Sequence, residues 1–385
     1  MGSSTRQQVR IPKVTYLDGL RGVASFVVLL AHFKELFLPG AAVDGTPLMF
    51  LVASKLAVLV FFVHSGFVLA WKYLSTGDIR ILVSMGIRRP LRLGIPIAVA
   101  VVFAWALMRA DLMMNSRVAS LTGAGGSFLQ LYDFEPTLYS ATVDALGGVL
   151  FLTNYRYNGA FWTMPIELLC SYAVFFVLPF VLRTATPPLV LLLFVGALAT
   201  INSYPWLTCF MAGILLVRLQ QEGIFREEGV LCHMIQSNRL VTPAIWAVVV
   251  SLAVWPGWVV AHLSVPGFLG PSHSLEIVSA VLLVVLLFTS RRFQTTLDSQ
   301  VGRQMGRMSF PVYLLHLPVL CSASSGIYLV ARAAQCPLWL NLALTFLATL
   351  VIVYSLSFLM AKYVDRFAIN VGKRALDRRL YAAPS

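Results

Sequence analysis

Apolar runs of about twenty residues, separated by short loops that carry Lys and Arg, recur along most of the chain. A run of this length is what an α-helix needs to cross the roughly 30 Å hydrocarbon core of a bilayer. The composition agrees, because 58% of the 385 residues are hydrophobic, only 12% are charged and the mean hydropathy is +0.81. These values exclude an ordinary soluble globular protein. The sequence therefore predicts an all-α fold, a polytopic bundle of membrane helices.

Loops rich in Lys and Arg predict the cytoplasmic side, because such loops stay on the inner side of the membrane. With this rule we expect about ten spans and place both termini in the cytoplasm. Residues 146–152 are apolar but too short to span, so we expect a re-entrant or interfacial piece there. The prediction is one membrane domain, residues 16–363, between cytoplasmic tails of residues 1–15 and 364–385. The expected spans are residues 17–38, 48–74, 93–110, 161–182, 189–202, 206–217, 241–260, 275–290, 309–330 and 338–362.

Positive charge follows the loops expected between these spans. The formal net charge is +13, and Lys and Arg gather between the second and third spans, over residues 291–307 and in the C-terminal tail. The positive-inside rule and attraction to anionic lipid account for this distribution, so we expect the bilayer and no nucleic acid as a partner.

Several classes of enzyme are disfavoured by missing motifs. The five cysteines are scattered without metal-ligand spacing, so we expect no metal site. The sequence has no Walker loop, dinucleotide fingerprint or GxSxG elbow. ATPases, dehydrogenases, zinc hydrolases and serine hydrolases are therefore not first choices, and no bound cofactor is expected.

The stretch Tyr16–Phe33, which covers most of the first predicted span, carries an arginine and a histidine in an otherwise apolar run. Arg21 and His32 are eleven residues apart, close to three helical turns, so both side chains lie on one face about 16 Å apart. Placing an ionisable side chain within a bilayer costs free energy, so we expect such a residue to face the bundle interior or a water-filled cavity and to have a function there. The alternative is a histidine satisfied by a neighbouring helix. Asp18, three residues before Arg21, forms either a structural ion pair or part of a site.

Further polar residues occur in other predicted spans. His64 and His316 are also intramembrane histidines, and three such residues in three spans suggest a shared cavity. Glu167 begins a span and needs a cationic partner from another span. Three neighbouring arginines either anchor the topology or bind the phosphates of a nucleotide-bearing donor such as coenzyme A. They are Arg88, Arg89 and Arg92.

The motif YLDGLRGVASFVVLLAHF resembles the opening helix of acyltransferase family 3, in which ten residues separate an Arg from a His, here Arg21 and His32. Other elements follow in the family's order. They are FFVHSGFVL for FFxxSGF, then RRPLRLGIP, FWTMPIE for a Trp-Ser-x-x-x-Glu type element, and MSFPVYLLHLP for Ser-Tyr-x-x-Tyr-Leu-x-His. The similarity extends over nearly the whole chain, and its first block is the most specific. The sequence departs from the pattern at His64, Thr163, Phe310 and Pro96.

The resemblance implies a ten-helix membrane acyltransferase with acyl-CoA, commonly acetyl-CoA, as cosubstrate and a hydroxyl as acceptor. It makes His32 the expected catalytic base, with Arg21 and Glu167 as further catalytic candidates. It implies that the acyl donor binds near Arg88, Arg89 and Arg92. Substrate-binding roles are expected for His64, Ser65, Trp162, Tyr313 and His316.

Two matters stay open at this level. The acceptor is a small molecule such as a secondary metabolite, or a glycan, and no residue pattern selects between them. The alternative function is a multipass transporter or flippase in which the same Arg, His and Glu residues form a substrate or proton path.

Overall fold

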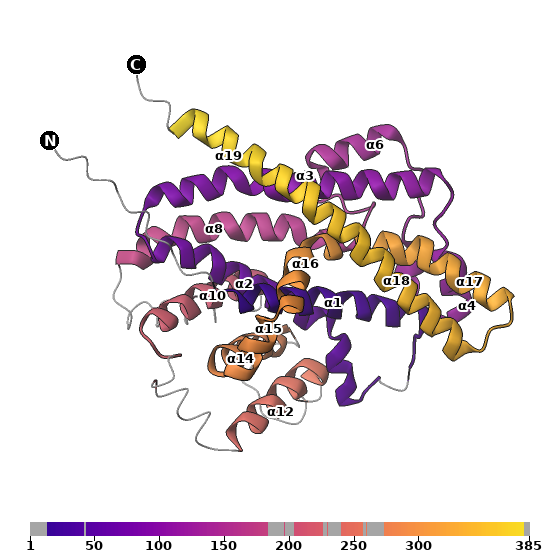
Figure 1. Cartoon of the computed structure of the whole chain (residues 1–385), viewed down its shortest axis with the longest axis horizontal. Coiled ribbons are helices and arrows are strands. Elements are labelled where there is room, and N and C mark those ends of the chain that lie inside the picture. Colours follow the sequence, from indigo (N-terminus) through magenta and orange to yellow (C-terminus); the bar gives the residue numbers. More distant parts are fainter. Residues whose placement is uncertain are drawn as a thin grey trace.

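The computed structural model describes residues 14–41, 44–183, 204–225, 240–256 and 273–380, together with residues 196, 229 and 259. Every regular element within these ranges is helical, which confirms the predicted all-α class (Figure 1). The elements in the first half are α1 (Tyr16–Phe37), η1 (Pro47–Val52), α2 (Ser54–Leu74), α3 (Ile79–Arg109), α4 (Asn115–Thr122), α5 (Gly126–Gln130), α6 (Leu138–Val143), η2 (Asp144–Gly148), α7 (Val149–Phe151), η3 (Gly159–Trp162) and α8 (Thr163–Arg183). Those in the second half are α10 (Pro205–Gln221), α12 (Val241–Val254), α14 (His273–Thr289), α15 (Arg291–Leu297), α16 (Gln300–Val319), η5 (Leu320–Ser324), α17 (Ser325–Ala333), α18 (Leu338–Met360), η6 (Ala361–Asp365) and α19 (Arg366–Leu380).

Among the described residues, five helices are long and apolar enough to cross a membrane, and a sixth is obtained if α14 and α15, which meet at 93°, form one bent span. The predicted count of about ten is therefore not confirmed. The helices α10 and α12 have 17 and 14 residues, fewer than the roughly 20 of a typical span. The predicted span at residues 189–202 lies outside the described ranges except for residue 196. The five helices cover Ser54–Leu74, Ile79–Arg109, Gly159–Val181, Gln300–Ala333 and Leu338–Arg374.

Two segments predicted as basic loops are largely helical, so these two predictions are wrong. Helix α3 begins at Ile79, capped by the Asp78 carboxylate, and its 31 residues contain the whole arginine cluster. Residues 291–307 form α15 and the first turns of α16. The reason is that Lys and Arg are good helix formers, so their presence indicates a side of the membrane and not the end of a helix. At 1.5 Å per residue α3 is about 46 Å long, enough to cross a bilayer and extend beyond it.

Small residues allow α1 and α16 to pack closely. A Cβ atom at Gly22 would lie 2.7 Å from the backbone nitrogen of Gly306, and one at Gly306 would overlap with the backbone of Asp18. Glycine removes this obstacle, as at many interfaces between membrane helices. The two helices touch again ten residues further along, at His32 and His316. Because both contacts have the same sequence offset, α1 and α16 run parallel and in register over this stretch.

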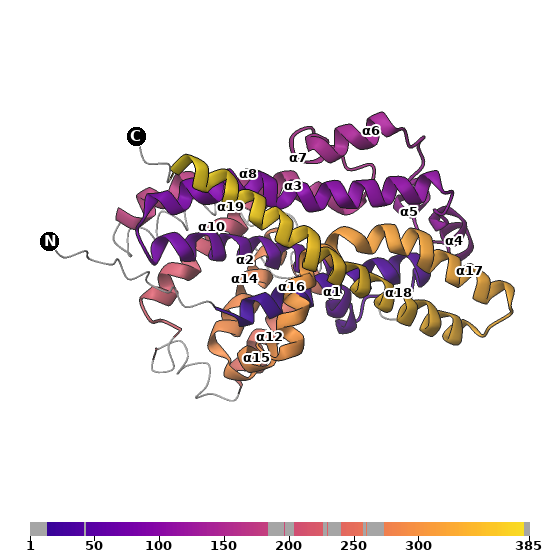
Figure 2. The same cartoon turned by 45° about the horizontal axis from the view of Figure 1, so that its top comes forward.

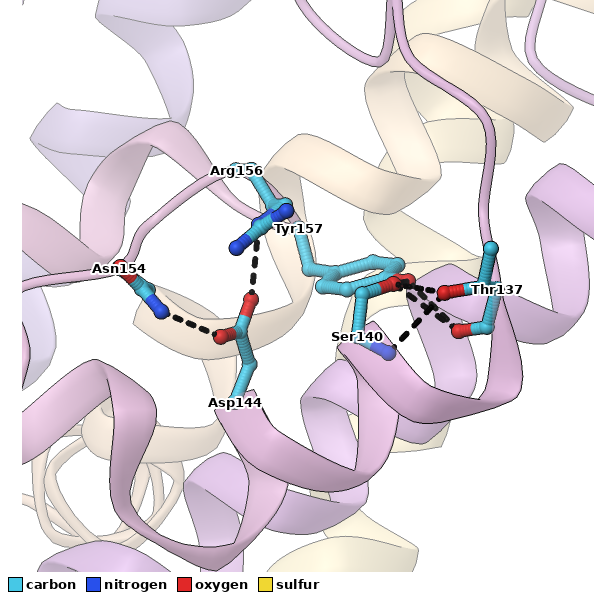
Figure 3. A network of polar contacts seen from close by, with 6 residues as sticks. All are labelled: Thr137, Ser140, Asp144, Asn154, Arg156 and Tyr157. Atoms are coloured by element: carbon cyan, nitrogen blue, oxygen red, sulfur yellow. Dashed lines mark hydrogen bonds and ion pairs between the residues drawn. The ribbon is translucent and has the colours of Figure 1, made fainter.

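A polar network fixes the segment between α6 and α8 (Figure 3). The buried carboxylate of Asp144 accepts a hydrogen bond from Asn154 at 2.8 Å and pairs with Arg156 at 3.2 Å. The Tyr157 hydroxyl lies 2.7 Å from that of Ser140, and burial raises the pKa of Tyr157. This phenol therefore stays protonated and able to donate. The apolar helix from Leu138 to Phe151 has too few residues to span, as expected for residues 146–152, and it lies against α3 (Figure 2).

Candidate active site

The parallel packing of α1 and α16 brings His32 and His316 into direct contact. Nε2 of His316 lies 3.2 Å from Nδ1 of His32, and the ring centroids are 5.1 Å apart. His316 is fully buried and His32 is partly buried. The two residues are 284 positions apart in the sequence, and close packing of their helices is what joins them.

Backbone acceptors determine which ring nitrogens carry protons. Nδ1 of His316 lies 2.8 Å from the carbonyl oxygen of Tyr313, so this nitrogen is the N–H donor of the neutral ring. Its Nε2 is then an acceptor. Nδ1 of His32 faces that acceptor and, at 3.0 Å, the carbonyl oxygen of Val28, so it also carries a proton. The lone pair of neutral His32 is therefore on Nε2, where it can accept a proton from a hydroxyl.

Tyr313 links this histidine pair to the segment that precedes α8. Its ring centroid is 5.8 Å from that of His316, and its hydroxyl lies 2.9 Å from the Thr163 hydroxyl and donates to the carbonyl oxygen of Ala160 at 3.0 Å. Thr163 stands where the family pattern has serine and keeps the hydroxyl that makes this contact. On another side of the pair, Phe128 of α5 meets the His32 ring edge-on at 6.3 Å. Aromatic side chains thus contact the histidine pair from two sides.

A large cavity of about 1180 Å³ adjoins this site, above the roughly 300–1,000 Å³ of typical ligand pockets. Its described lining contains eight Lys or Arg side chains and three carboxylates, an excess of five formal positive charges. The cations are Arg21, Lys72, Arg88, Arg89, Arg92, Arg307, Lys362 and Arg366, and the acids are Asp18, Glu167 and Asp365. A cavity of this size and charge suits an elongated ligand with several phosphates.

Part of this charge is neutralised inside the protein. Arg89 of α3 forms an ion pair with Glu167 of α8, and both side chains are only 13% exposed. Asp18 and Asp365, two other acids of the cavity, both interact favourably with Arg21 and Arg92. The expectation that Glu167 needs a cationic partner from another span is met by Arg89.

The structure divides the predicted site residues into three groups. Most of them line the cavity: Arg21, His64, Ser65, Arg88, Arg89, Arg92, Glu167 and Tyr313. His32 and His316 lie beyond Tyr313, which both lines the cavity and contacts His316. Trp162 is outside the cavity lining, 37% exposed, and packs against Trp206 with ring centroids 5.1 Å apart. His64 lines the cavity, so the three histidines do not form one cluster.

Sequence reasoning missed the cavity residues that come from the C-terminal part of the chain. Lys362, Asp365, Arg366 and Ile369 all line the cavity. Their spacing of three, four and seven residues places them on one face of a helix, and this periodicity was the available signal. A basic tail was expected there, because the positive-inside rule explains Lys and Arg without helical order.

Comparison with known proteins gives a consistent result. The profile of acyltransferase family 3, described as an acyltransferase domain, matches residues 14–361. The O-acetyltransferase PaAT-1 of Phomopsis amygdali is 23% identical over 98% of this chain and 87% of its own length. The acyltransferase clz18 of Cochliobolus lunatus is 22% identical over 82% of this chain and 85% of its own length. No solved structure shows a significant match. The chain belongs to acyltransferase family 3.

Proposed function

We propose that this chain is a membrane O-acyltransferase, and specifically an O-acetyltransferase, that moves an acyl group from acyl-CoA to a hydroxyl group. The observation that carries the proposal is the His32–His316 hydrogen bond, which leaves Nε2 of His32 as the proton acceptor in a pair that Tyr313 joins to a large basic cavity. The name of one relative, an O-acetyltransferase, supports acetyl as the transferred group.

The proposed reaction is a direct transfer between two bound substrates. Nε2 of His32 takes the proton of the acceptor hydroxyl while its oxygen attacks the carbonyl carbon of the thioester. The new C–O bond forms, the C–S bond breaks, and the thiolate takes the proton back from the imidazolium. The products are an ester and free coenzyme A thiol. A positioned general base contributes roughly 10²–10⁴-fold to the rate of such a step.

The donor occupies the basic cavity in this proposal. Its nucleotide lies among the cations, and its thioester end extends past Tyr313 toward His32, because Tyr313 is the residue shared by the cavity and the histidine pair. Arg21 and the Arg89–Glu167 pair line the cavity between helices α1, α3 and α8. They hold the donor in line with the base, and such positioning is a large part of catalysis.

The proposed acceptor is a small molecule with a hydroxyl group and a largely apolar body, such as a secondary metabolite. The aromatic side chains of Phe128 and Tyr313 beside the histidine pair support an apolar acceptor over a strongly hydrated glycan. The proposal keeps both termini in the cytoplasm, where acyl-CoA is available.

The test uses full-length protein in nanodiscs with labelled acetyl-CoA and a panel of terpenoid, polyketide and sugar alcohols. Donor-dependent formation of a labelled ester is expected for the wild type. His32→Ala should reduce turnover roughly 10²–10⁴-fold while the protein elutes as a single species on size-exclusion chromatography. Val23→Ala, which changes an exposed side chain on the same helix α1 and outside the cavity lining, is the control and should retain activity.

Turnover of His32→Ala at the wild-type rate would contradict the proposed base. Transport of an acceptor across the bilayer without any acyl donor, together with no ester in any assay, would favour a transporter or flippase.

A further inference from the structure

The C-terminal helix contributes to the wall of the basic cavity. Helix α18 continues through η6 into α19, and α19 crosses α3 in both views (Figures 1 and 2). A Cβ atom at Gly372 would lie 3.2 Å from Cγ of Arg88, so the backbone of α19 rests against that side chain. The predicted domain boundary at residue 363 falls inside this continuous helical segment. The family profile ends at residue 361, so this part of the wall lies beyond the match.

The cavity's cations fall into two sets by their partners. Arg21, Arg89 and Arg92 interact with carboxylates that also line the cavity. Within the described part of the chain, the other five make no ion pair: Lys72, Arg88, Arg307, Lys362 and Arg366. The Nε atom of Arg88 is buried without a hydrogen-bond partner among the described residues. The unneutralised charge therefore comes from α2, α3, α16 and the junction of η6 and α19.

Helical geometry places the C-terminal cations together. Lys362 and Arg366 are one turn apart and line the cavity from the same face. Helix α16, which carries Arg307, contacts η6. Asp365 lies on this face as well and stabilises Arg21 and Arg92. The segment thus supplies both a counter-ion for the arginines already paired and cations that are open for a ligand.

We propose that residues 361–372 form part of the donor site and that Arg366 and Arg307, with Arg88 and Lys362, bind the phosphate groups of coenzyme A. This inference rests on the proposed function. Coenzyme A carries a diphosphate and a separate 3′-phosphate, and several guanidinium groups around a cavity bind such groups by charge-assisted hydrogen bonds. Anionic lipid headgroups offer the same phosphate chemistry, but the cations line one cavity together with the buried residues Thr163 and Tyr313. That location favours a ligand that enters the bundle.

The experiment measures binding of unacylated coenzyme A, which cannot react, to full-length protein in nanodiscs of neutral lipid. Arg366→Glu and Arg307→Glu should each raise the Kd about tenfold or more, the effect expected for losing a charge-assisted contact to phosphate. Arg374→Glu is the matched control, because Arg374 is on the same helix but exposed and outside the cavity lining. Its Kd should change less than about twofold, as for an exposed charge. Arg366→Gln provides a milder variant, and thermal unfolding confirms that each protein is folded.

Two results would overturn the inference while leaving the proposed function in place. One is acetyl transfer by the wild type with equal Kd values for the variants at positions 366, 307 and 374. The other is a change in affinity seen only in nanodiscs that contain phosphatidylserine, which would assign these cations to lipid. A wild-type protein that neither binds coenzyme A nor transfers an acetyl group would overturn both proposals.

Discussion

The hydrogen bond between His32 and His316 predicts that His316 acts on the reaction through His32. His316 would be a positioning residue, because its Nε2 accepts the Nδ1 proton of His32 at 3.2 Å and thereby keeps the other nitrogen of His32 free. His316→Leu removes this acceptor at similar side-chain volume. His316→Gln keeps an acceptor oxygen in nearly the same place.

The size of the effect follows from the partners that remain. Without His316, Nδ1 of His32 still has the carbonyl oxygen of Val28 at 3.0 Å, so the ring keeps an acceptor and does not lose its role entirely. The loss is then one hydrogen bond, about 1–1.5 kcal/mol, which corresponds to a fall in kcat of about five- to thirteenfold. This is much smaller than the loss expected for removing the base itself.

The assay compares kcat and the donor KM of the wild type, His316→Leu and His316→Gln in nanodiscs. We expect His316→Leu to lower kcat without changing the donor KM, because the phosphate contacts are elsewhere, and His316→Gln to recover most of the lost rate. Equal impairment of the two variants would mean that the acceptor atom is unimportant and that His316 is needed only for packing. Full activity of His316→Leu would refute the tautomer argument altogether.

Three further predictions concern the structure that holds the site. Gly306→Ala should destabilise the protein by about 1–3 kcal/mol in thermal unfolding, because the new Cβ overlaps with the backbone of α1. Gly326→Ala should be tolerated, because its Cβ would lie 3.5 Å from a methionine sulfur. Equal unfolding temperatures for the two variants would contradict this packing. Glu167→Gln should cost about 1.5–3 kcal/mol by weakening the pair with Arg89, and an unchanged unfolding temperature would show that the pair contributes little. Thr15, the residue before α1, donates a hydrogen bond to Asp298 and holds the pKa of that carboxyl below its usual value. The stabilisation that this bond gives the folded protein is therefore complete above the unfolded pKa of about 3.9, and it is lost as the pH falls through the lower folded pKa. Asp298→Asn should weaken the dependence of the unfolding temperature on pH below about 4. An unchanged pH dependence in that range would contradict this role of Asp298.

Some features of the protein were determined by the sequence alone, because they depend on local order. Runs of apolar residues near bilayer length predict helices whatever their neighbours are, and every regular element in the described part of the chain is helical. The eleven-residue spacing of Arg21 and His32 places them on one helix face without any tertiary information. The ordered motifs also led to acyltransferase family 3, which the family profile confirms.

Helix ends and span count were less accessible to sequence reasoning. The composition around the arginines of α3 resembles that of a loop, yet Arg and Lys continue a helix readily, and prolines are tolerated in membrane helices because neighbouring groups satisfy the freed backbone. Pro90 and Pro96 lie inside the helix. The same holds for the junction at residues 361–365, where a change of composition occurs within one continuous helical segment.

Only the tertiary structure decided which polar residues meet. His32 and His316 form a pair because Gly22 and Gly306 let two parallel helices approach, and a contact between residues 284 positions apart leaves no local trace in the sequence. For the same reason His64 lines the cavity and does not join them. The division of the cations into paired and open ones depends on which carboxylates the packing of α3, α8 and the C-terminal helix brings near them, since charge interactions fall off with distance in space and not along the chain.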